Sequence, residues 1–231
     1  MTNAGKHNDN LDAATSRVIE GATWKRQRTI LVMPASVSIP FKVAAAMRGL
    51  ISPPNQPFLF FGAEGMEVGD AYSRTLEGII SHAELRDWEY LLTMEHDNLP
   101  PQDGLLKLIA AMDKHPEYAA IGGLYWTKGE GGVPQIWGDP KDPVLNYRPQ
   151  PPQAGAVVEC CGTGMGFTLY RLSMFRDWKG PKPIFQTKAS AAGVGTQDLV
   201  FWSEARKFGH RCAIDCSVLV GHLDVGTGIV W

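Results

Sequence analysis

The sequence predicts an α/β domain with a mostly parallel central sheet flanked by helices. Short apolar runs, several of them closed by proline, glycine or an acidic residue, alternate with segments of helical periodicity. Short uninterrupted apolar runs are typical of strands buried on both faces, and their alternation with helices indicates parallel connections. Hydrophobic residues make up 44% of the 231-residue chain, enough to bury a substantial core.

Five apolar runs are predicted as strands. They occupy residues 29–33, 58–61, 90–94, 118–121 and about 211–220. The fourth run is expected to close at the Gly122-Gly123 pair, and the last at Gly221-His222. Glycine at such positions permits the sharp change of direction that a chain makes on leaving a sheet.

Four segments between and after these runs have helical patterns, at residues 41–50, 70–86, about 100–112 and 197–208. In the third, Pro100 and Pro101 suit a helix start. Its apolar residues then recur at i, i+3, i+4 and i+7, namely Leu105, Leu108, Ile109 and Met112. In the fourth, Phe201, Ala205 and Phe208 are expected to share one face. Residues 129–155 are rich in glycine and proline and are predicted as binding-surface loops.

Residues 1–23 are polar and aperiodic, so we expect a flexible tail followed by a single domain over residues 24–231. Lys and Arg number 22 and Asp and Glu 24, and the resulting charge of −2 gives no global basic field for nucleic acid. No apolar run approaches the ~20 residues that span a bilayer. The four cysteines form no CxxC pair. We therefore expect a soluble, cytoplasmic protein with reduced thiols and no membrane partner.

Ligands of open α/β sheets bind beyond the carboxyl ends of the strands. That rule nominates Pro34-Ala35-Ser36, Gly62-Ala63-Glu64, Glu95-His96-Asp97 and the Gly122-Gly123 turn. The third is chemically the richest, because two carboxylates and an imidazole directly follow an apolar strand. Hard oxygen ligands at a rigid strand end suit Mg²⁺ or Mn²⁺. The spacing alone is equally compatible with an exposed loop in which Asp97 or Asn98 caps the next helix.

Residues 91–101, LLTMEHDNLPP, resemble the hydrophobic strand and DxD-type motif of GT-A-fold glycosyltransferases, especially the family 2-like group. Two further motifs follow in the same order. Residues 195–201, GTQDLVF, resemble the helix start in which Glu or Gln precedes Asp, and residues 220–224, VGHLD, resemble the strand-end histidine. Small phage-encoded glycosyltransferases are similar to this version. The resemblance covers residues 29–224 and implies a GT-A, Rossmann-like fold.

The resemblance also implies roles for individual residues. Asp97 and His222 would ligate Mn²⁺ or Mg²⁺, and Glu95 would contact the nucleotide ribose or the metal shell. This sequence departs from the pattern in having Glu rather than Asp as the first acid, with His96 in the middle. Asp198 matches the catalytic base of inverting members, which deprotonates an acceptor hydroxyl. Alternatively, Asp198 has only a structural role, as a carboxylate in the first turn of a helix, where the helix dipole stabilises negative charge.

Nucleotide-sugar binding is expected from several further positions. Arg74 matches an arginine that is often followed by asparagine in the family, although Thr75 follows here, and it could instead form a surface ion pair. The other residues expected to bind the donor are Pro34, Ala35, Glu95, His96, Gly162 and Gly164. The last two belong to the glycine-rich segment CCGTGMGF, whose alternative role is a strand packed closely against a helix.

The expected function is therefore a metal-dependent, inverting glycosyltransferase that uses a nucleotide-diphospho-sugar, with UDP as the expected nucleotide. One candidate acceptor is a hydroxymethylated pyrimidine in phage DNA, which would place the enzyme in the host cytoplasm. Protein, lipid-linked and small-molecule acceptors stay open, as does the oligomeric state. Two alternatives are a metal-dependent nucleotidyltransferase and a catalytically inactive GT-A-like domain that binds a glycan or a partner.

Overall fold

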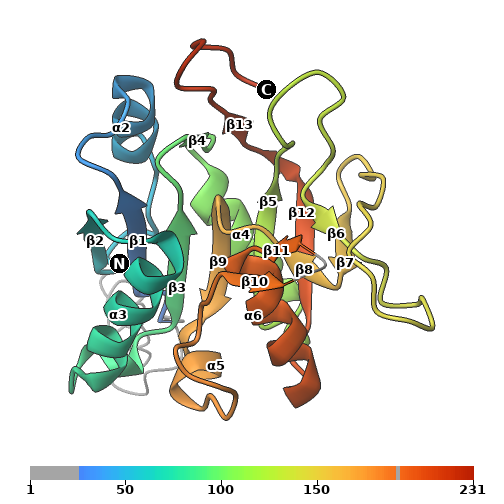
Figure 1. Cartoon of the computed structure of the whole chain (residues 1–231). Helices are drawn as coiled ribbons and strands as arrows, with labels where there is room; N and C mark the ends of the chain where they lie inside the picture. Colours follow the sequence, from blue (N-terminus) through green and yellow to red (C-terminus); the bar gives the residue numbers. More distant parts are fainter. Residues whose placement is uncertain (1–25, 191–192) are drawn as a thin grey trace, which may run out of the picture.

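The computed structural model describes residues 26–190 and 193–231. The tail predicted at residues 1–23 lies outside the described residues. The chain folds around a seven-stranded sheet with strand order β2-β1-β3-β9-β5-β12-β7 (Figure 1). The strands are β1 (Thr29–Ala35), β2 (Phe58–Glu64), β3 (Tyr90–Met94), β5 (Ala120–Leu124), β7 (Val157–Cys160), β9 (Phe167–Arg171) and β12 (Cys212–Leu219).

Strands β2, β1, β3, β5 and β12 run in the same direction, while β9 and β7 run antiparallel to their neighbours. The predicted mixed α/β architecture with a mostly parallel sheet is thus confirmed. β9 was not predicted as a strand, yet it lies at the centre of the sheet between β3 and β5. Its residues follow the glycine-rich segment directly, and only the strand order shows that they continue into the sheet.

Three pairs of short strands lie outside the main sheet. They are β4 (Asn98–Leu99) with β13 (Gly221–His222), β6 (Ile136–Trp137) with β8 (Gly162–Thr163), and β10 (Lys188–Ser190) with β11 (Gly193–Gly195). The first pair matters most for the site, because it fastens the segment after β3 to the C-terminal segment.

Helices cover both faces of the sheet. On one face lie α3 (Val68–Ser81), α5 (Leu172–Arg176) and α6 (Gln197–Ala205), drawn in front in Figure 1. On the other face lie α2 (Phe41–Arg48) and α4 (Gly104–Lys114). Two 3-10 turns, η1 (Leu85–Asp87) and η2 (Arg206–Phe208), complete the regular structure of the described residues. Each face has its own apolar cluster, as expected for strands whose two sides are both buried.

Several helix boundaries differ from the sequence prediction. The helix expected over 70–86 ends at Ser81, because His82 is extended and its ring Nδ1 accepts hydrogen bonds from the N–H groups of Glu84 and Leu85. The helix expected from Pro100 begins at Gly104. In the fourth helix the buried face ends at Ala205, since Phe208 lies in η2 and is 46% exposed.

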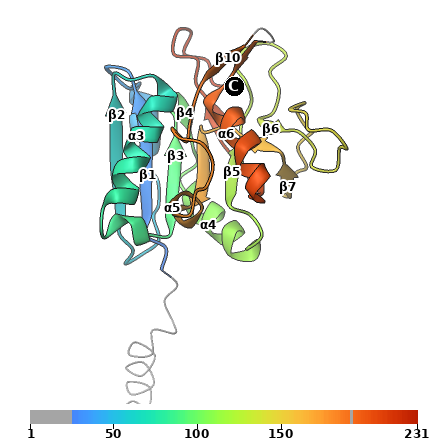
Figure 2. The same ribbon diagram turned by 60° about the horizontal axis from the view of Figure 1, so that its bottom comes forward.

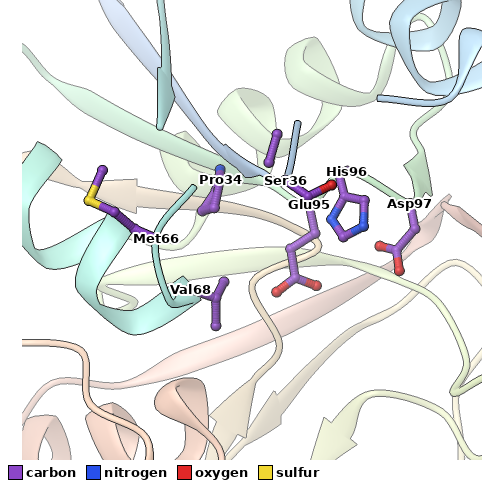
Figure 3. Close-up of a pocket in the computed structure, with 8 residues that line it drawn as sticks. Pro34, Ser36, Met66, Val68, Glu95, His96 and Asp97 are labelled. Carbon is purple, nitrogen blue, oxygen red and sulfur yellow. The ribbon is translucent and has the colours of Figure 1, made fainter. Parts of the chain in front are cut away.

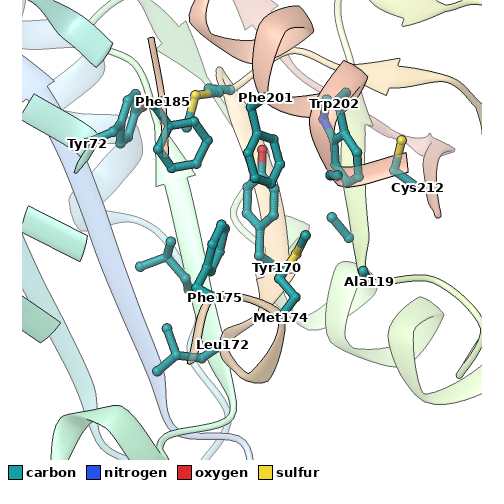
Figure 4. Close-up of a cluster of buried hydrophobic side chains, with 14 of the residues drawn as sticks. Tyr72, Ala119, Tyr170, Leu172, Met174, Phe175, Phe185, Phe201, Trp202 and Cys212 are labelled. Atoms are coloured by element: carbon teal, nitrogen blue, oxygen red, sulfur yellow. The ribbon is translucent and has the colours of Figure 1, made fainter. Parts of the chain in front are cut away.

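An aromatic cluster holds α6 against the sheet (Figure 4). The Phe185 and Phe201 rings lie 4.7 Å apart, and Trp202 stacks on Tyr170 of β9 at 6.1 Å with the ring planes 15° apart. The Trp202 indole N–H also donates to Thr163 Oγ1 at 3.0 Å. Burial of these large side chains fixes the position of the first turn of α6 relative to the central strands.

None of the described helices has the length and apolar character that a membrane crossing needs. All four cysteines are buried free thiols.

Gly122 and Gly123 lie inside β5 and do not form the turn that the sequence predicted. A Cβ atom at Gly122 would lie 2.7 Å from Thr168 Oγ1 and 2.9 Å from Ile214 Cδ1, so neighbouring strands fill the space. The strand continues to Leu124, which moves the ligand-facing loop of β5 downstream to the segment that begins at Tyr125.

Gly122→Ala is expected to destabilise the fold by roughly 1–3 kcal/mol, because the packed strand has no room for the methyl group. Gly78→Ala in α3 is the matched control, since nothing lies within 4 Å of its added Cβ. Alanine's helix propensity should there stabilise the protein by up to ~1 kcal/mol. Denaturant unfolding measures both effects, and equal stability of the two variants would contradict the placement of Gly122.

Candidate functional site

A cavity of about 380 Å³ opens at the carboxyl ends of β1 and β3 (Figure 3). Its lining residues are Pro34, Ala35, Ser36, Met66, Val68, Glu95, His96 and Asp97. Five of the predicted site residues, from two separate strand ends, therefore meet at one cavity. They meet because β1 and β3 are parallel neighbours, with Val32 opposite Thr93, so that both chains leave the sheet at the same edge.

Asp97 is tied to two distant segments of the chain. Its carboxylate accepts a charge-assisted hydrogen bond from the Lys128 ammonium, and Oδ2 lies 3.5 Å from His222 Nε2. Its backbone carbonyl accepts a hydrogen bond from the Leu223 N–H at 2.7 Å. The side chain is 13% exposed, and its buried Oδ1 has no hydrogen-bond partner. Neither Asp97 nor Asn98 caps the next helix, whose N-cap is Asp103.

The orientation of His222 is fixed by its other ring nitrogen. His222 Nδ1 lies 2.7 Å from the Trp126 carbonyl oxygen. Since a carbonyl oxygen can only accept, Nδ1 carries a proton, and Nε2 is the ring nitrogen that faces Asp97. Nε2 can bind a cation whenever it carries no proton. Anchoring of Nδ1 by a backbone carbonyl is also the usual arrangement for a metal-binding histidine.

The pKa of Asp97 is lowered to about 2. Burial alone raises the pKa, but hydrogen bonds from His222 and Lys128, together with their charges, outweigh it. The carboxylate is therefore ionised throughout the neutral range, as a metal or cation ligand must be.

Glu95 behaves in the opposite way. Burial is the largest cause, followed by repulsion from Asp97 and Asp198, and these raise the pKa of Glu95 to about 8 despite an opposing effect of Lys128. In Figure 3 the Glu95 and Asp97 carboxylates lie on either side of the His96 ring. Mutual repulsion of this kind shows that the acidic side chains share one low-dielectric region.

Asp198 lies in the first turn of α6, where its Oδ1 accepts a hydrogen bond from the Leu199 N–H at 2.8 Å. Burial raises the pKa of Asp198, while hydrogen bonds from the Thr196 hydroxyl and from backbone N–H groups oppose the rise. Its charge raises the pKa of Glu95, so the fold brings this carboxylate from the far end of the sequence to the β3 site.

The donor set fits a divalent cation through two protein ligands. Among the described residues no group of three His, Cys, Asp or Glu side chains converges as a metal centre. The predicted trio of Asp97, His222 and Glu95 therefore does not form a three-ligand metal centre, but Asp97 and His222 do face each other. The unpartnered Asp97 Oδ1 and the anchored His222 ring are the features that suit a hard cation, with remaining positions left to ligand oxygens or water.

Three predicted donor-binding residues lie elsewhere. Arg74 is exposed on α3 and is not among the residues that line the cavity. Gly162 lies against Leu199 and Trp202 of α6, which matches the alternative of a strand packed against a helix. A Cβ atom at Gly164 would lie 2.1 Å from the Tyr125 hydroxyl oxygen. These two glycines make room for α6 and for Tyr125.

Lys128 and Asn98 were not predicted as site residues, whereas the aromatic ring of Tyr125 was a candidate for stacking on a sugar or a base. Lys128 follows the true end of β5, and the carboxyl-end rule would have found it if the strand had not been ended at Gly122. The Tyr125 hydroxyl accepts a hydrogen bond from the Gly166 N–H at 2.9 Å. Asn98 is fully buried and its side-chain amide has no partner, which no sequence signal indicated.

No protein-family model and no curated protein matches this chain. Among solved structures 75 chains match, and one of them is A197 from STIV. That structure superposes with a TM-score of 0.61 at 18% sequence identity, over 85% of this chain and 86% of that chain. At this identity the similarity shows a shared fold and nothing about activity.

The raised pKa of Glu95 predicts a pH-dependent stability. Between pH 4.5 and about 8 the folded chain retains a proton that the unfolded chain releases. The stability that protonated Glu95 gives the folded chain is fully present below pH 4.5 and is lost as the pH rises toward 8. Glu95→Gln has no such proton, so its stability relative to wild type should rise over that window by up to about 4–5 kcal/mol. Denaturant unfolding with a chelator present measures it; parallel pH curves would contradict the burial of Glu95.

Proposed function

We propose that this chain is a GT-A-type glycosyltransferase that moves a sugar from a nucleotide-diphospho-sugar to an acceptor hydroxyl. One observation carries the proposal. An ionised, largely buried Asp97 with a free oxygen faces His222 Nε2 beside an open cavity at the carboxyl ends of two parallel strands. The motif resemblance supplies the reaction class, and the geometry supports it by bringing its separate motifs to one place.

The cavity would hold the donor nucleotide, with UDP as the first candidate. A volume of about 380 Å³ lies within the usual range of ~300–1,000 Å³ for small-ligand sites. Its apolar wall, formed by Pro34, Met66 and Val68, suits a planar base or a ribose. The polar side, formed by Glu95, His96 and Asp97, suits the ribose hydroxyls and the diphosphate.

Asp97 and His222 would hold a Mn²⁺ or Mg²⁺ ion. When bound, such an ion neutralises the charge that develops on the departing nucleoside diphosphate. Lys128 supplies a second positive charge at the same place, because its ammonium already contacts Asp97. On donor binding it can exchange that contact for a phosphate oxygen without leaving the site.

Asp198 would act as the general base. The acceptor oxygen forms a bond to the anomeric carbon, the bond from that carbon to the diphosphate breaks, and the hydroxyl proton passes to Asp198. Attack opposite the leaving group inverts the anomeric centre. A pKa raised by burial makes the ionised carboxylate a stronger base.

Several classes of acceptor are compatible with this site. A hydroxymethylated pyrimidine in DNA is one candidate, and strong dependence of acceptor binding on salt would distinguish it from small molecules. A catalytically inactive glycan- or partner-binding domain is the second candidate function. The observation that favours it is Lys128, which neutralises Asp97 without any metal.

Nucleotide binding tests the donor site. With one of UDP, GDP or ADP at ~100 times its Kd, and only with Mn²⁺ present, the wild type should gain about 2.7 kcal/mol of stability in a thermal shift measurement. Asp97→Asn should abolish the metal-dependent part, and Asp103→Asn at the surface should not. A nucleotide shift that needs Lys128 but no metal would support a metal-independent site, and no shift at all would favour the binding domain.

Removal of the proposed base should separate binding from chemistry. Asp198→Asn is expected to lower kcat by roughly 10²–10⁴ and to leave donor binding intact, as measured by release of nucleoside diphosphate and by thermal shift. Glu204→Gln on the same helix should keep the wild-type rate. If Asp198→Asn retained full activity, the assignment of the base would be wrong.

A further inference from the structure

Strand β2 ends the central sheet on one side. In the part of the chain that the structure describes, no strand pairs with its outer side, and Figure 2 shows it at the margin of the sheet. Its sequence is FLFFGAE, in which the first charged residue is Glu64. Natural edge strands are usually protected by lysine, proline, a bulge or a covering segment. Residues 58–63 carry no such protection within the strand.

The register of the β1–β2 pair fixes which backbone groups of β2 point outward. The Thr29 N–H donates to the Pro57 carbonyl at 3.2 Å, and the Gly65 N–H donates to the Ala35 carbonyl at 3.2 Å. In a parallel pair this phase directs the odd-numbered residues of β2 toward β1. The N–H and C=O groups of the even-numbered residues therefore face outward, at Phe58, Phe60, Gly62 and Glu64. Pro57 belongs to the inward set, so its missing N–H leaves no gap in the outer edge.

The side chains at this edge are apolar on both faces of the sheet. Leu59 is 37% exposed and Phe60 is 47% exposed, although both are large and apolar. Phe58 packs on the cluster beneath α2 and α4, whereas Phe61 packs on the cluster beneath α3. A strand that paired here would therefore cover apolar surface on both faces as well as the free backbone groups.

We propose that β2 pairs antiparallel with β2 of a second copy of this chain, about a two-fold axis at Phe60. Outward-facing residues must then lie opposite one another, and this register satisfies that condition at every even-numbered position. It places Phe60 opposite Phe60 of the second copy, Phe58 opposite Gly62, and Leu59 opposite Phe61. The two sheets of seven strands would join into one continuous sheet.

Charge and symmetry favour a second copy over an unrelated strand. A two-fold interface needs a surface complementary to itself, and an uncharged apolar strand meets that requirement. The first acid, Glu64, would lie opposite the neutral Gln56, so no like charges meet. Phe58 would cover the bare backbone of Gly62, a pairing known to stabilise edge glycines. A charged foreign strand would instead place charges against Leu59 and Phe60.

Sedimentation velocity of the full chain, from about 1 to 100 µM, tests the proposal. Wild type should sediment with twice the 25.3 kDa chain mass, with dissociation toward low concentration. Phe60→Pro should be monomeric throughout, because it removes an outward N–H that β1 does not use and edge strands tolerate proline there. Phe60→Lys should be monomeric as well, and Phe60→Tyr should stay dimeric. Circular dichroism confirms that each variant is folded.

Cross-linking tests the register. Phe60→Cys should form an inter-chain disulfide under mild oxidation, since a cysteine opposite itself lies at ~5.5 Å between Cα atoms. Phe58→Cys should not, because Gly62 lies opposite, and the four native cysteines are buried. A wild type that is monomeric at every concentration would overturn the proposal, whether another strand or nothing covers the edge. Dimers that persist in Phe60→Pro, or cross-link through Phe58→Cys, would also overturn it.

Discussion

A carboxylate that is only 13% exposed needs polar partners, and Asp97 obtains them from two segments far away in the sequence. Lys128 comes from the loop after β5 and His222 from β13, while the Leu223 N–H binds the Asp97 backbone carbonyl. The turn after β3, the β5 loop and the C-terminal segment are therefore held together at one ionised group. Without the Asp97 carboxylate, the Lys128 ammonium and the His222 ring would lose their shared partner. The arrangement of these three segments therefore depends on the negative charge of Asp97.

The second constraint is the antiparallel strand β9 between β3 and β5. Tyr170 on β9 stacks on Trp202, and this aromatic contact seats α6 so that its first turn reaches the acidic region. Asp198 thereby comes close enough to raise the pKa of Glu95. The result is a group of acids with divergent properties. Asp97 is ionised and suited to hold a cation, whereas burial makes Glu95 and Asp198 reluctant to ionise and suited to proton transfer.

The groups that lack partners differ between the cavity and the sheet edge. At the carboxyl ends of the strands, polar side chains remain under-satisfied, as shown by the free Asp97 Oδ1 and the unpartnered amide of Asn98. Such groups are stabilised when a ligand, an ion or a water molecule supplies the missing partner. Along β2 the missing partners are backbone groups and apolar surface, which call for another strand. The two surfaces share no residue, because the cavity is lined from the ends of β1 and β3 and the loop after β2, whereas the edge is formed by β2 itself.

The amino-acid pattern by itself determined the α/β class, most strand positions and the acidic cluster after β3, because burial on both faces leaves apolar runs that are visible locally. It also nominated Asp198 and His222 through their motifs. The strand status of Gly122, the central position of β9 and the role of Lys128 were decided only by tertiary structure. Their neighbours come from other strands, and a local pattern reports how buried a residue is but not which distant residue lies against it. The same reason explains why Gly162 and Gly164 looked like a ligand-binding segment: glycine marks close approach, and only the fold shows that α6 and Tyr125 are what approach.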